Sequence, residues 1–380
     1  MKIAIIGGGI TGLTTAIALR KLGIPAEIFE QSEELKEVGA GIMLQPNAMK
    51  ILDRLHLGNT IREHGIILHR MEITDQDLHP LKDFENGINN DVSNQIIGIH
   101  RGRLQQILYN ALPPETVHLG HTYSSHSSNN GTIEIKFQDS TYTADVLLGA
   151  DGIHSKVRQQ LFPTASLRDS QQVCWRGISP IPLPPDLRHV GRESWGPGKR
   201  FGITQVSAEK TYWFAVLNSS VDISLDPNYV KSDLQNQFKD FAPIVNQIIE
   251  HTASTQIIRG DLFDLKRLPT WHLGSVCLLG DAAHAMTPNM GQGAGQGIED
   301  SYCMSNVLNQ NKTPKRAFEK FETLRRKKVD YIVNNSWRFG KMAHSTTGQF
   351  FLKLIMKFSP HSVVLSQMKK LYAVHDFENK

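Results

Sequence analysis

The sequence predicts an α/β fold in which a discontinuous Rossmann-like domain carries an inserted β-rich substrate domain and C-terminal helices. Glycine-rich turns follow apolar, strand-like runs near both ends of the chain. Short β-rich pieces with Pro- and Gly-rich loops fill residues 173–264, and helical patterns end the chain. The predicted boundaries are residues 1–70, 98–170 and 271–340 for the nucleotide-binding domain, 71–97 and 171–270 for the substrate domain, and 341–380 for a C-terminal helical tail.

The N-terminal segment predicts a βαβ unit. Residues 2–7 form a continuous apolar run, as expected for a parallel strand that is covered on both faces. Residues 11–22 follow with helical spacing, and residues 26–30 then have the pattern of a second strand. A glycine-rich turn in this context is typical of a dinucleotide-binding fingerprint.

Each fingerprint residue has a distinct physical role. Gly7 permits the tight corner between strand and helix, Gly9 lets the backbone approach a pyrophosphate, and Gly12 allows close helix packing. Glu30 lies at the offset where a carboxylate accepts hydrogen bonds from a ribose. The alternative is a glycine-rich turn without a ligand, but the strand, the helix and Glu30 together favour dinucleotide binding.

A second signature lies near the other end of the chain. Residues 276–284 make up this signature, and Asp281 lies in it at the end of a buried-strand run. Asp281 is placed to accept hydrogen bonds from ribityl hydroxyls or to cap a helix. Gly291 and Gly293 precede a helical run over residues 295–308 and predict a second anion-facing helix start. Two such signatures suggest one long cofactor that is held at both ends, and FAD has that shape.

The composition is that of a soluble globular protein of 380 residues, with 40% hydrophobic and 21% charged residues. The odd, scattered cysteines Cys174, Cys277 and Cys303 argue against a disulfide framework and a structural zinc site, and they favour a reducing, cytoplasmic location. No apolar window reaches the length of a membrane span. The net charge of +4 is mild, and we interpret the basic run 325–328 as a solvated helix face, which disfavours nucleic acid as a partner.

Several longer stretches resemble one family. The fingerprint with Glu30, "GADGIHSKVR" and "GDAAHAMTPNMGQG" are similar to group A flavoprotein monooxygenases, the single-component FAD hydroxylases related to para-hydroxybenzoate hydroxylase. The resemblance extends to "VGAGIMLQPNAMKIL", "HRGRL" and "WGPGKRFG", and so covers almost the whole chain. The pattern is most similar to the branch that contains salicylate, 3-hydroxybenzoate, urate and zeaxanthin oxygenases.

The resemblance implies a set of site residues. Those implied in binding FAD non-covalently are Gly7, Gly9, Ile10, Thr11, Gly12, Glu30, Gln31, Gly41, Arg101, Asp151, Gly152, Gly280, Asp281, Pro288, Gly291, Gln292 and Gly293. Arg200 and Tyr212 match positions that face flavin or substrate in urate-hydroxylating relatives, although a sheet-packing role for Tyr212 is equally consistent with the sequence. Pro288 belongs to the loop beside the isoalloxazine ring and is, with Arg200 and Tyr212, a candidate catalytic residue. No metal is implied.

The resemblance also implies a reaction. NAD(P)H binds transiently and reduces FAD, since the chain holds one nucleotide fingerprint only. The reduced flavin and O2 give a C4a-hydroperoxide that hydroxylates a small aromatic or heteroaromatic substrate. The alternatives are a non-oxygenating flavin reductase or dehydrogenase, a flavin-binding sensor without turnover, and a tetracycline-inactivating monooxygenase. A flavin halogenase is disfavoured because the sequence lacks a WxWxIP element.

Four further features have ordinary structural explanations. We expect His284 to bond to the backbone at a helix start rather than to act as a base. Trp175 and Trp195 fit the core of the middle domain better than a substrate cavity. Residues 350–358 predict an amphipathic basic helix that packs on the body or covers the cavity, with a membrane surface as the alternative and no firm membrane association expected.

Overall fold

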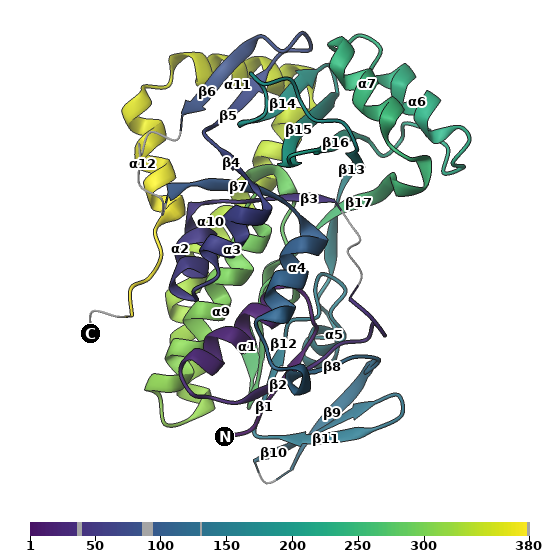
Figure 1. Ribbon diagram of the computed structural model, residues 1–380. Coiled ribbons are helices and arrows are strands. Elements are labelled where there is room, and N and C mark those ends of the chain that lie inside the picture. The colour runs from purple at the N-terminus through teal and green to yellow at the C-terminus, as the bar shows by residue number, and fades with distance from the viewer. Residues whose placement is uncertain (36–39, 86–93, 130, 378–380) are drawn as a thin grey trace.

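The computed structural model describes residues 1–35, 40–85, 94–129 and 131–377. Val38 and Gly39, the first residues of one of the family-like stretches, lie outside them. Within these residues the structure confirms the α/β class with an inserted β-rich sheet and C-terminal helices. Figure 1 shows the nucleotide-type sheet low in the molecule and the larger sheet above it.

The strands are β1 (Ile3–Ile6), β2 (Ala26–Phe29), β3 (Gly41–Leu44), β4 (Ile66–Leu68), β5 (Arg70–Thr74), β6 (Pro80–Glu85), β7 (Ile96–His100), β8 (Val117–His118), β9 (Tyr123–Asn129), β10 (Thr132–Phe137), β11 (Thr141–Ala144), β12 (Val146–Gly149), β13 (Leu167–Ser179), β14 (Val190–Gly196), β15 (Lys199–Ser207), β16 (Lys210–Asn218), β17 (Ile258–Leu265), β18 (His272–Leu273) and β19 (Val276–Leu278).

The α-helices are α1 (Ile10–Lys21), α2 (Pro46–Arg54), α3 (Gly58–His64), α4 (Arg101–Asn110), α5 (Lys156–Leu161), α6 (Val230–Gln237), α7 (Pro243–His251), α8 (Asp281–His284), α9 (Gly293–Gln310), α10 (Pro314–His344), α11 (Thr346–Phe358) and α12 (His361–Tyr372). A short 3-10 turn, η4 (Pro288–Met290), precedes α9.

The nucleotide-type sheet has the strand order β18-β19-β12-β1-β2-β8. Its centre is parallel, with β1 between β12 and β2, and all four residues of β1 are buried. Burial on both faces explains why these strands are continuous apolar runs rather than alternating ones. The unit β1-α1-β2 confirms the βαβ expectation.

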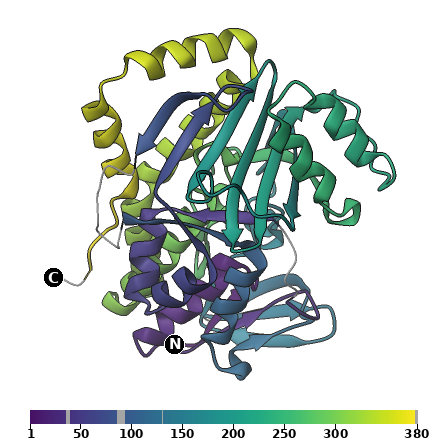
Figure 2. The ribbon, with the colours of Figure 1, turned by 45° about the horizontal axis from the view of Figure 1, so that its top comes forward.

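The larger sheet has the order β17-β13-β16-β15-β14-β5-β6 and is antiparallel except where β5 runs parallel to β14. Helices α6 and α7 cover one face of it, and Phe201, Trp213 and Phe238 lie in the core between them. Figure 2 shows these helices against the tall strands of the sheet. Two three-stranded sheets, β3-β7-β4 and β9-β10-β11, complete the strand arrangement of the described residues. The exact division of the chain into domains stays a prediction. Helix α10 runs unbroken through position 340, where the sequence predicts the boundary between the nucleotide-binding domain and the C-terminal tail.

The two tryptophans of the middle segment differ in their surroundings. Trp175 is buried in the core of the larger sheet, as expected. Trp195 is also buried, but it packs against Ala343, Leu352 and Met356 of the C-terminal helices. The far end of the larger sheet is therefore covered by α10 and α11.

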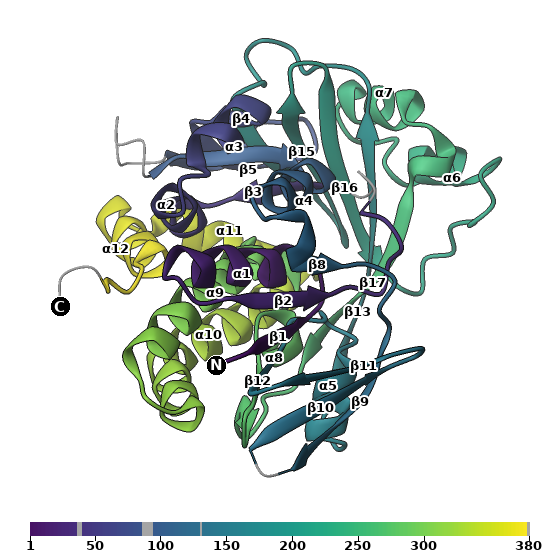
Figure 3. The same ribbon diagram turned by 60° about the horizontal axis from the view of Figure 1, so that its bottom comes forward.

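Helices α1 and α9 lie side by side, as Figure 3 shows from below. A Cβ on Gly297 of α9 would overlap Thr11 Oγ1 of α1. Gly12 is required inside the β1–α1 turn instead, where a Cβ would overlap the Gly7 carbonyl oxygen. Ser301 Oγ donates to the Thr11 carbonyl oxygen at 2.9 Å, so a side-chain hydrogen bond also joins the two helices. This approach brings the N-termini of two helices that are distant in sequence to the same region.

We expect Gly297→Ala to destabilise the protein by about 1–3 kcal/mol, because the added methyl overpacks against Thr11. Adding Thr11→Ala removes the clashing hydroxyl. The double variant should then regain wild-type stability, helped by the better helix propensity of alanine, about 1 kcal/mol. Urea unfolding measures both changes. A double variant as unstable as Gly297→Ala alone would show that the α1–α9 contact is not the source of the loss.

Candidate cofactor and active site

The turn between β1 and α1 has one open glycine and two packed ones. Gly7 has φ +108°, and a Cβ there would lie 2.5 Å from the Ala150 carbonyl oxygen. Around Gly9, by contrast, no atom lies within 4 Å of the position that a Cβ would occupy, and no side chain caps the first N–H groups of α1. Free N–H groups beside open space form an anion site at the positive end of the helix dipole.

Glu30 lies beside this turn at the end of β2. Its Oε2 accepts from the Gly8 N–H at 2.6 Å and its Oε1 accepts from the Ser32 N–H at 2.9 Å. The side chain is half-buried, while its neighbour Gln31 is exposed. Ile10 is buried in the first turn of α1, so its side chain serves the core while its backbone belongs to the turn.

The second end of the site is the turn from β19 into α8. Gly280 has φ +56°, and a Cβ there would lie 2.7 Å from Thr11 Oγ1, so this turn lies against the start of α1. The side chain of Asp281 is exposed to solvent. The protein atoms around its carboxylate nevertheless disfavour the charged form and raise its pKa, and the positive charges of His284 and Arg101 oppose this shift. Asp281 and Arg101, which are far apart in sequence, are therefore neighbours in one accessible region.

Asp151 has a structural role in the "GADG" turn. Its Oδ1 accepts from Ser155 Oγ at 2.6 Å and its Oδ2 accepts from the Val157 N–H at 3.1 Å, so it holds the start of α5. Burial raises the pKa of Asp151, although these hydrogen bonds oppose the shift. Gly152 follows with φ +76° and open space at its Cβ position.

The loop that precedes α9 is held by Gln45, which sequence reasoning did not single out. Gln45 Nε2 donates to the carbonyl oxygens of Met290 and Gly291 at 3.2 and 3.3 Å, and its Oε1 accepts from Gln292 Nε2 at 2.6 Å. Gly291 adopts φ +61°, and no side chain caps α9. The N–H groups at the start of α9, beside Gly293, are thus also available to an anion.

A buried ion network lies behind this loop. Arg325 donates to Glu299 Oε2 at 2.5 Å and to Asp300 Oδ1 at 2.8 Å, and all three side chains are buried. His284 Nε2 lies 2.6 Å from Asp300 Oδ2, which also accepts from the Gly280 N–H at 2.9 Å. The network therefore connects α10 to both the Asp281 turn and α9.

Two expectations are wrong at this network. The basic run is not a uniformly solvated face, because Arg325 is buried and only Lys327 of the four is exposed. Arg325 lies four residues from both Phe321 and Val329, which are buried, and this helical spacing was the sequence signal that Arg325 is buried as well.

The second wrong expectation concerns His284, whose ring bonds to the carboxylate of Asp300 rather than to the backbone. Burial would raise the pKa of Asp300, but His284 and Arg325 outweigh it and hold this pKa below its ordinary value.

The structure places Arg200 against the turn that contains Pro288. Arg200 on β15 is buried, and its guanidinium donates to Glu193 Oε1 at 3.0 Å and to Asn289 Oδ1 at 2.8 Å. Asn289 follows Pro288 in η4, so the larger sheet contacts the turn in front of α9. His344 lies near Arg200, and burial together with that positive charge lowers the pKa of His344 to about 4. His344 is therefore neutral at neutral pH.

Tyr212 on β16 packs against Gly41 on β3, where a Cβ would overlap the tyrosine ring. The ring is largely buried, and burial raises the pKa of Tyr212, with Cys174 as a second cause. Tyr212 therefore stays a neutral phenol that can donate a hydrogen bond. It lies on the strand next to that of Arg200, in the same sheet, and contacts β3.

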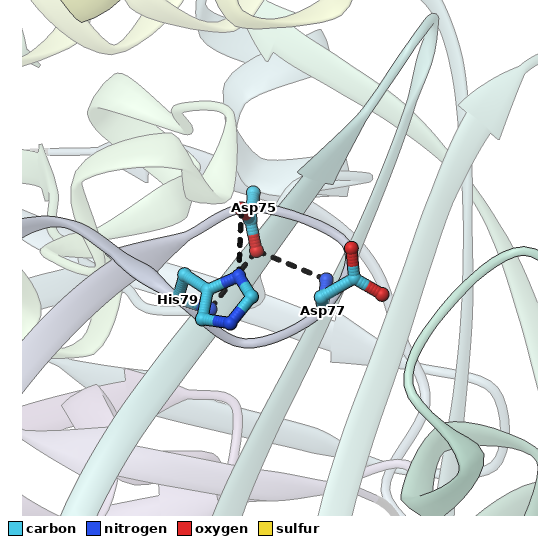
Figure 4. Close-up of side chains that lie close together, drawn as sticks. All are labelled: Asp75, Asp77 and His79. Atoms are coloured by element: carbon cyan, nitrogen blue, oxygen red, sulfur yellow. Dashed lines mark hydrogen bonds and ion pairs between the residues drawn. The ribbon is translucent and has the colours of Figure 1, made fainter.

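One cluster of possible metal-ligating side chains lies elsewhere, in the turn between β5 and β6 (Figure 4). Asp75 Oδ1 accepts from the backbone N–H groups of Asp77 and His79 at 3.0 and 2.9 Å, and Asp75 Oδ2 lies 3.3 Å from His79 Nδ1. These bonds make Asp75 the organiser of the turn. The cluster is largely exposed and is explained by turn formation.

Two uncapped helix starts, a ribose-side carboxylate and an accessible aspartate define a site for an extended dinucleotide that is held at both ends. A match to the model of the FAD binding domain family covers residues 1–336. The chain belongs to this family, and it is an FAD-dependent monooxygenase.

Curated relatives and solved structures agree with this class. The chain is 33% identical over 344 residues to aurachin C monooxygenase/isomerase of Stigmatella aurantiaca, covering 90% of this chain and 89% of the relative. It is 29% identical to 2-heptyl-3-hydroxy-4(1H)-quinolone synthase of Pseudomonas aeruginosa, with 90% and 89% covered. HpxO of Klebsiella pneumoniae, solved with FAD and uric acid, superposes with a TM-score of 0.89 at 25% identity, with 98% and 96% covered.

The residues present fit FAD. The open space at Gly9 admits a pyrophosphate, Glu30 lies where the ribose of the ADP half is recognised, and Asp281 with Arg101 is accessible at the other end. Gly293 also has nothing near its Cβ position. The individual roles implied for these residues stay predictions that occupancy measurements can test.

We expect Gly9→Val to give a folded protein with little bound FAD. Nothing lies within 4 Å of the new Cβ, and φ −76°, ψ −178° is extended backbone that valine adopts, so only the ligand loses space. Gly260→Val on β17 is the matched control, because its Cβ position is equally open. The flavin-to-protein absorbance ratio of the purified proteins measures occupancy. Full occupancy in Gly9→Val would contradict the proposed pyrophosphate site.

We expect Arg325→Met to destabilise the protein by about 3–5 kcal/mol, because it leaves the buried carboxylates of Glu299 and Asp300 without their shared cation. Lys327→Met removes the same charge from the exposed face of the same helix and should change stability by no more than about 0.5 kcal/mol. Chemical denaturation of both variants at neutral pH measures the difference. Equal stabilities would refute a structural role for the network.

Proposed function

We propose that this protein hydroxylates a small aromatic or heteroaromatic compound, with O2 as oxidant, bound FAD as the redox group and NAD(P)H as a transient electron donor. The names of its relatives support a ring substrate: a quinolone for one, and uric acid in the complex of another. The three cysteines are buried and free, which suits a reducing compartment and supports a cytoplasmic location.

The contact between Arg200 and Asn289 is the observation that carries this proposal. It joins the larger sheet to the turn at Pro288, just before the uncapped start of α9. A substrate that lies on this sheet would therefore be positioned next to the redox end of the cofactor. Because Arg200 is tied to Glu193 and Asn289, we assign it to positioning this turn rather than to proton transfer.

When bound, FAD supplies electron acceptance from NAD(P)H and activation of O2. The chain's own residues provide the setting. The N–H groups at the start of α9 stabilise negative charge that develops near them. Asp281 and Arg101 orient the cofactor, and Tyr212, held protonated by burial, offers a hydrogen-bond donor from the sheet.

The test is NADH and NADPH oxidation by the FAD-loaded protein with simultaneous measurement of hydrogen peroxide, across phenolic acids, purines, quinolones and tetracycline. We expect one ring compound to accelerate NAD(P)H oxidation while peroxide release falls, and mass spectrometry should detect a product with one added oxygen. Gly9→Val, stripped of FAD, is the matched negative control for the protein preparation.

The other outcomes identify the alternatives. Rapid NAD(P)H oxidation that is never coupled to product, for any compound, would support a non-oxygenating reductase or dehydrogenase. Failure of NAD(P)H to bleach the flavin with any ligand would support a sensor. Conversion of tetracycline alone would support a tetracycline-inactivating activity. The tetracycline destructase Tet(51) shares the fold of this chain, with a TM-score of 0.71 at 20% identity.

A further inference from the structure

Helix α11 has two apolar faces, and only one of them is packed. Leu352 and Met356 are buried against Trp195 and the end of α10. The opposite face carries large apolar side chains that are exposed to solvent. They are Phe350 (60% exposed), Phe351 (58%), Leu354 (37%), Ile355 (55%) and Phe358 (73%). The expectation that this helix simply packs on the body therefore holds for half of its circumference.

These five side chains form one continuous stripe. Their spacing of one, three, one and three residues keeps them on a single side of a helix with 3.6 residues per turn. Val363 on the neighbouring α12 is also exposed. Other exposed large hydrophobic residues, such as Leu225 and Leu273, are scattered singly over the rest of the described chain. A gathered apolar patch of this kind marks an interaction surface.

The segment that carries the stripe has charged side chains of one sign only. Residues 331–375 contain no Asp or Glu. The cationic side chains of this segment are Arg338, Lys341, Lys353, Lys357, Lys369 and Lys370, and all but the half-buried Lys353 are exposed. Lys357 Nζ lies 6.0 Å from the centroid of the Phe358 ring, at the border of the stripe. Lysines that flank an apolar face can extend their charged ends toward lipid headgroups while the apolar side chains enter the interface.

We propose that the exposed face of α11 binds the surface of an anionic lipid bilayer. An interfacial helix needs an apolar face, flanking cations and no acidic residues, and α11 has all three. The attachment is peripheral, since no helix of the described residues is long and apolar enough to cross a bilayer. A symmetric contact with a second copy is disfavoured, because it would place Lys353 and Lys357 near their own copies.

The position of α11 allows this attachment. Figures 1 and 2 show α11 and α12 at the outer rim, on the side remote from the N-terminus and the nucleotide-type sheet. A bilayer that contacts this rim leaves the Gly9 turn free. Binding can therefore be measured on the FAD-loaded protein whether or not its substrate is known, and it stands or fails independently of the proposed reaction.

The experiment is co-sedimentation of the full-length, FAD-loaded protein with vesicles of phosphatidylcholine alone and of phosphatidylcholine with phosphatidylglycerol. We expect binding to the anionic vesicles that weakens as salt rises. The triple variant Phe351→Ser/Ile355→Ser/Phe358→Ser should not bind the anionic vesicles. Lys353→Gln/Lys357→Gln should weaken binding by about 30-fold, since each lysine near an anionic surface contributes about a fivefold factor.

Two matched controls separate this surface from general effects. Leu225→Ser/Tyr229→Ser removes exposed apolar side chains near α6, and Lys312→Gln/Lys315→Gln removes two exposed charges before and at the start of α10. Both should bind like wild type, and flavin content and thermal unfolding verify that every variant is folded. Absence of binding to anionic vesicles, or wild-type binding by the triple variant, would overturn the proposal. So would a dimer, detected by sedimentation, that dissociates in the triple variant while vesicle binding is absent.

Discussion

The close packing of α1 on α9 is the constraint on which the site depends. Gly297 of α9 leaves no room for a Cβ, because Thr11 of α1 fills the space between the helices. Because the backbones approach so closely, the free N–H groups at both helix starts open to one region, although residues 22–292 separate the two helices in sequence. A long dinucleotide can then be held at both ends by backbone dipoles, with few charged side chains.

This arrangement is supported from behind by buried charges. Arg325 neutralises Glu299 and Asp300, and Asp300 in turn holds His284 and the Gly280 N–H. Burying these groups carries a large desolvation penalty, and the attraction between them offsets it only when every partner is present. The network therefore favours one relative position of α8, α9 and α10, and it fixes the turn that presents Asp281.

The larger sheet and the C-terminal helices complete the molecule by contacts that are distant in sequence. Arg200 reaches Asn289 from the sheet, and Trp195 is covered by α10 and α11. The same helix α11 that closes the core around Trp195 leaves Phe351 and Phe358 exposed. One amphipathic helix can thus stabilise the body with one face and remain available to an external surface with the other.

The sequence by itself determined the βαβ unit, the two glycine-rich turns, the α/β class and the family. These features are local: strand, turn and helix lie within about 30 residues, so the spacing of Gly7, Gly9, Gly12 and Glu30 carries the information. Only the tertiary structure decided which carboxylates Arg325 pairs with, that Arg200 holds Asn289, and which face of α11 is packed. Those outcomes depend on partners far along the chain, and a helical pattern with apolar residues on two sides does not specify which side meets the core.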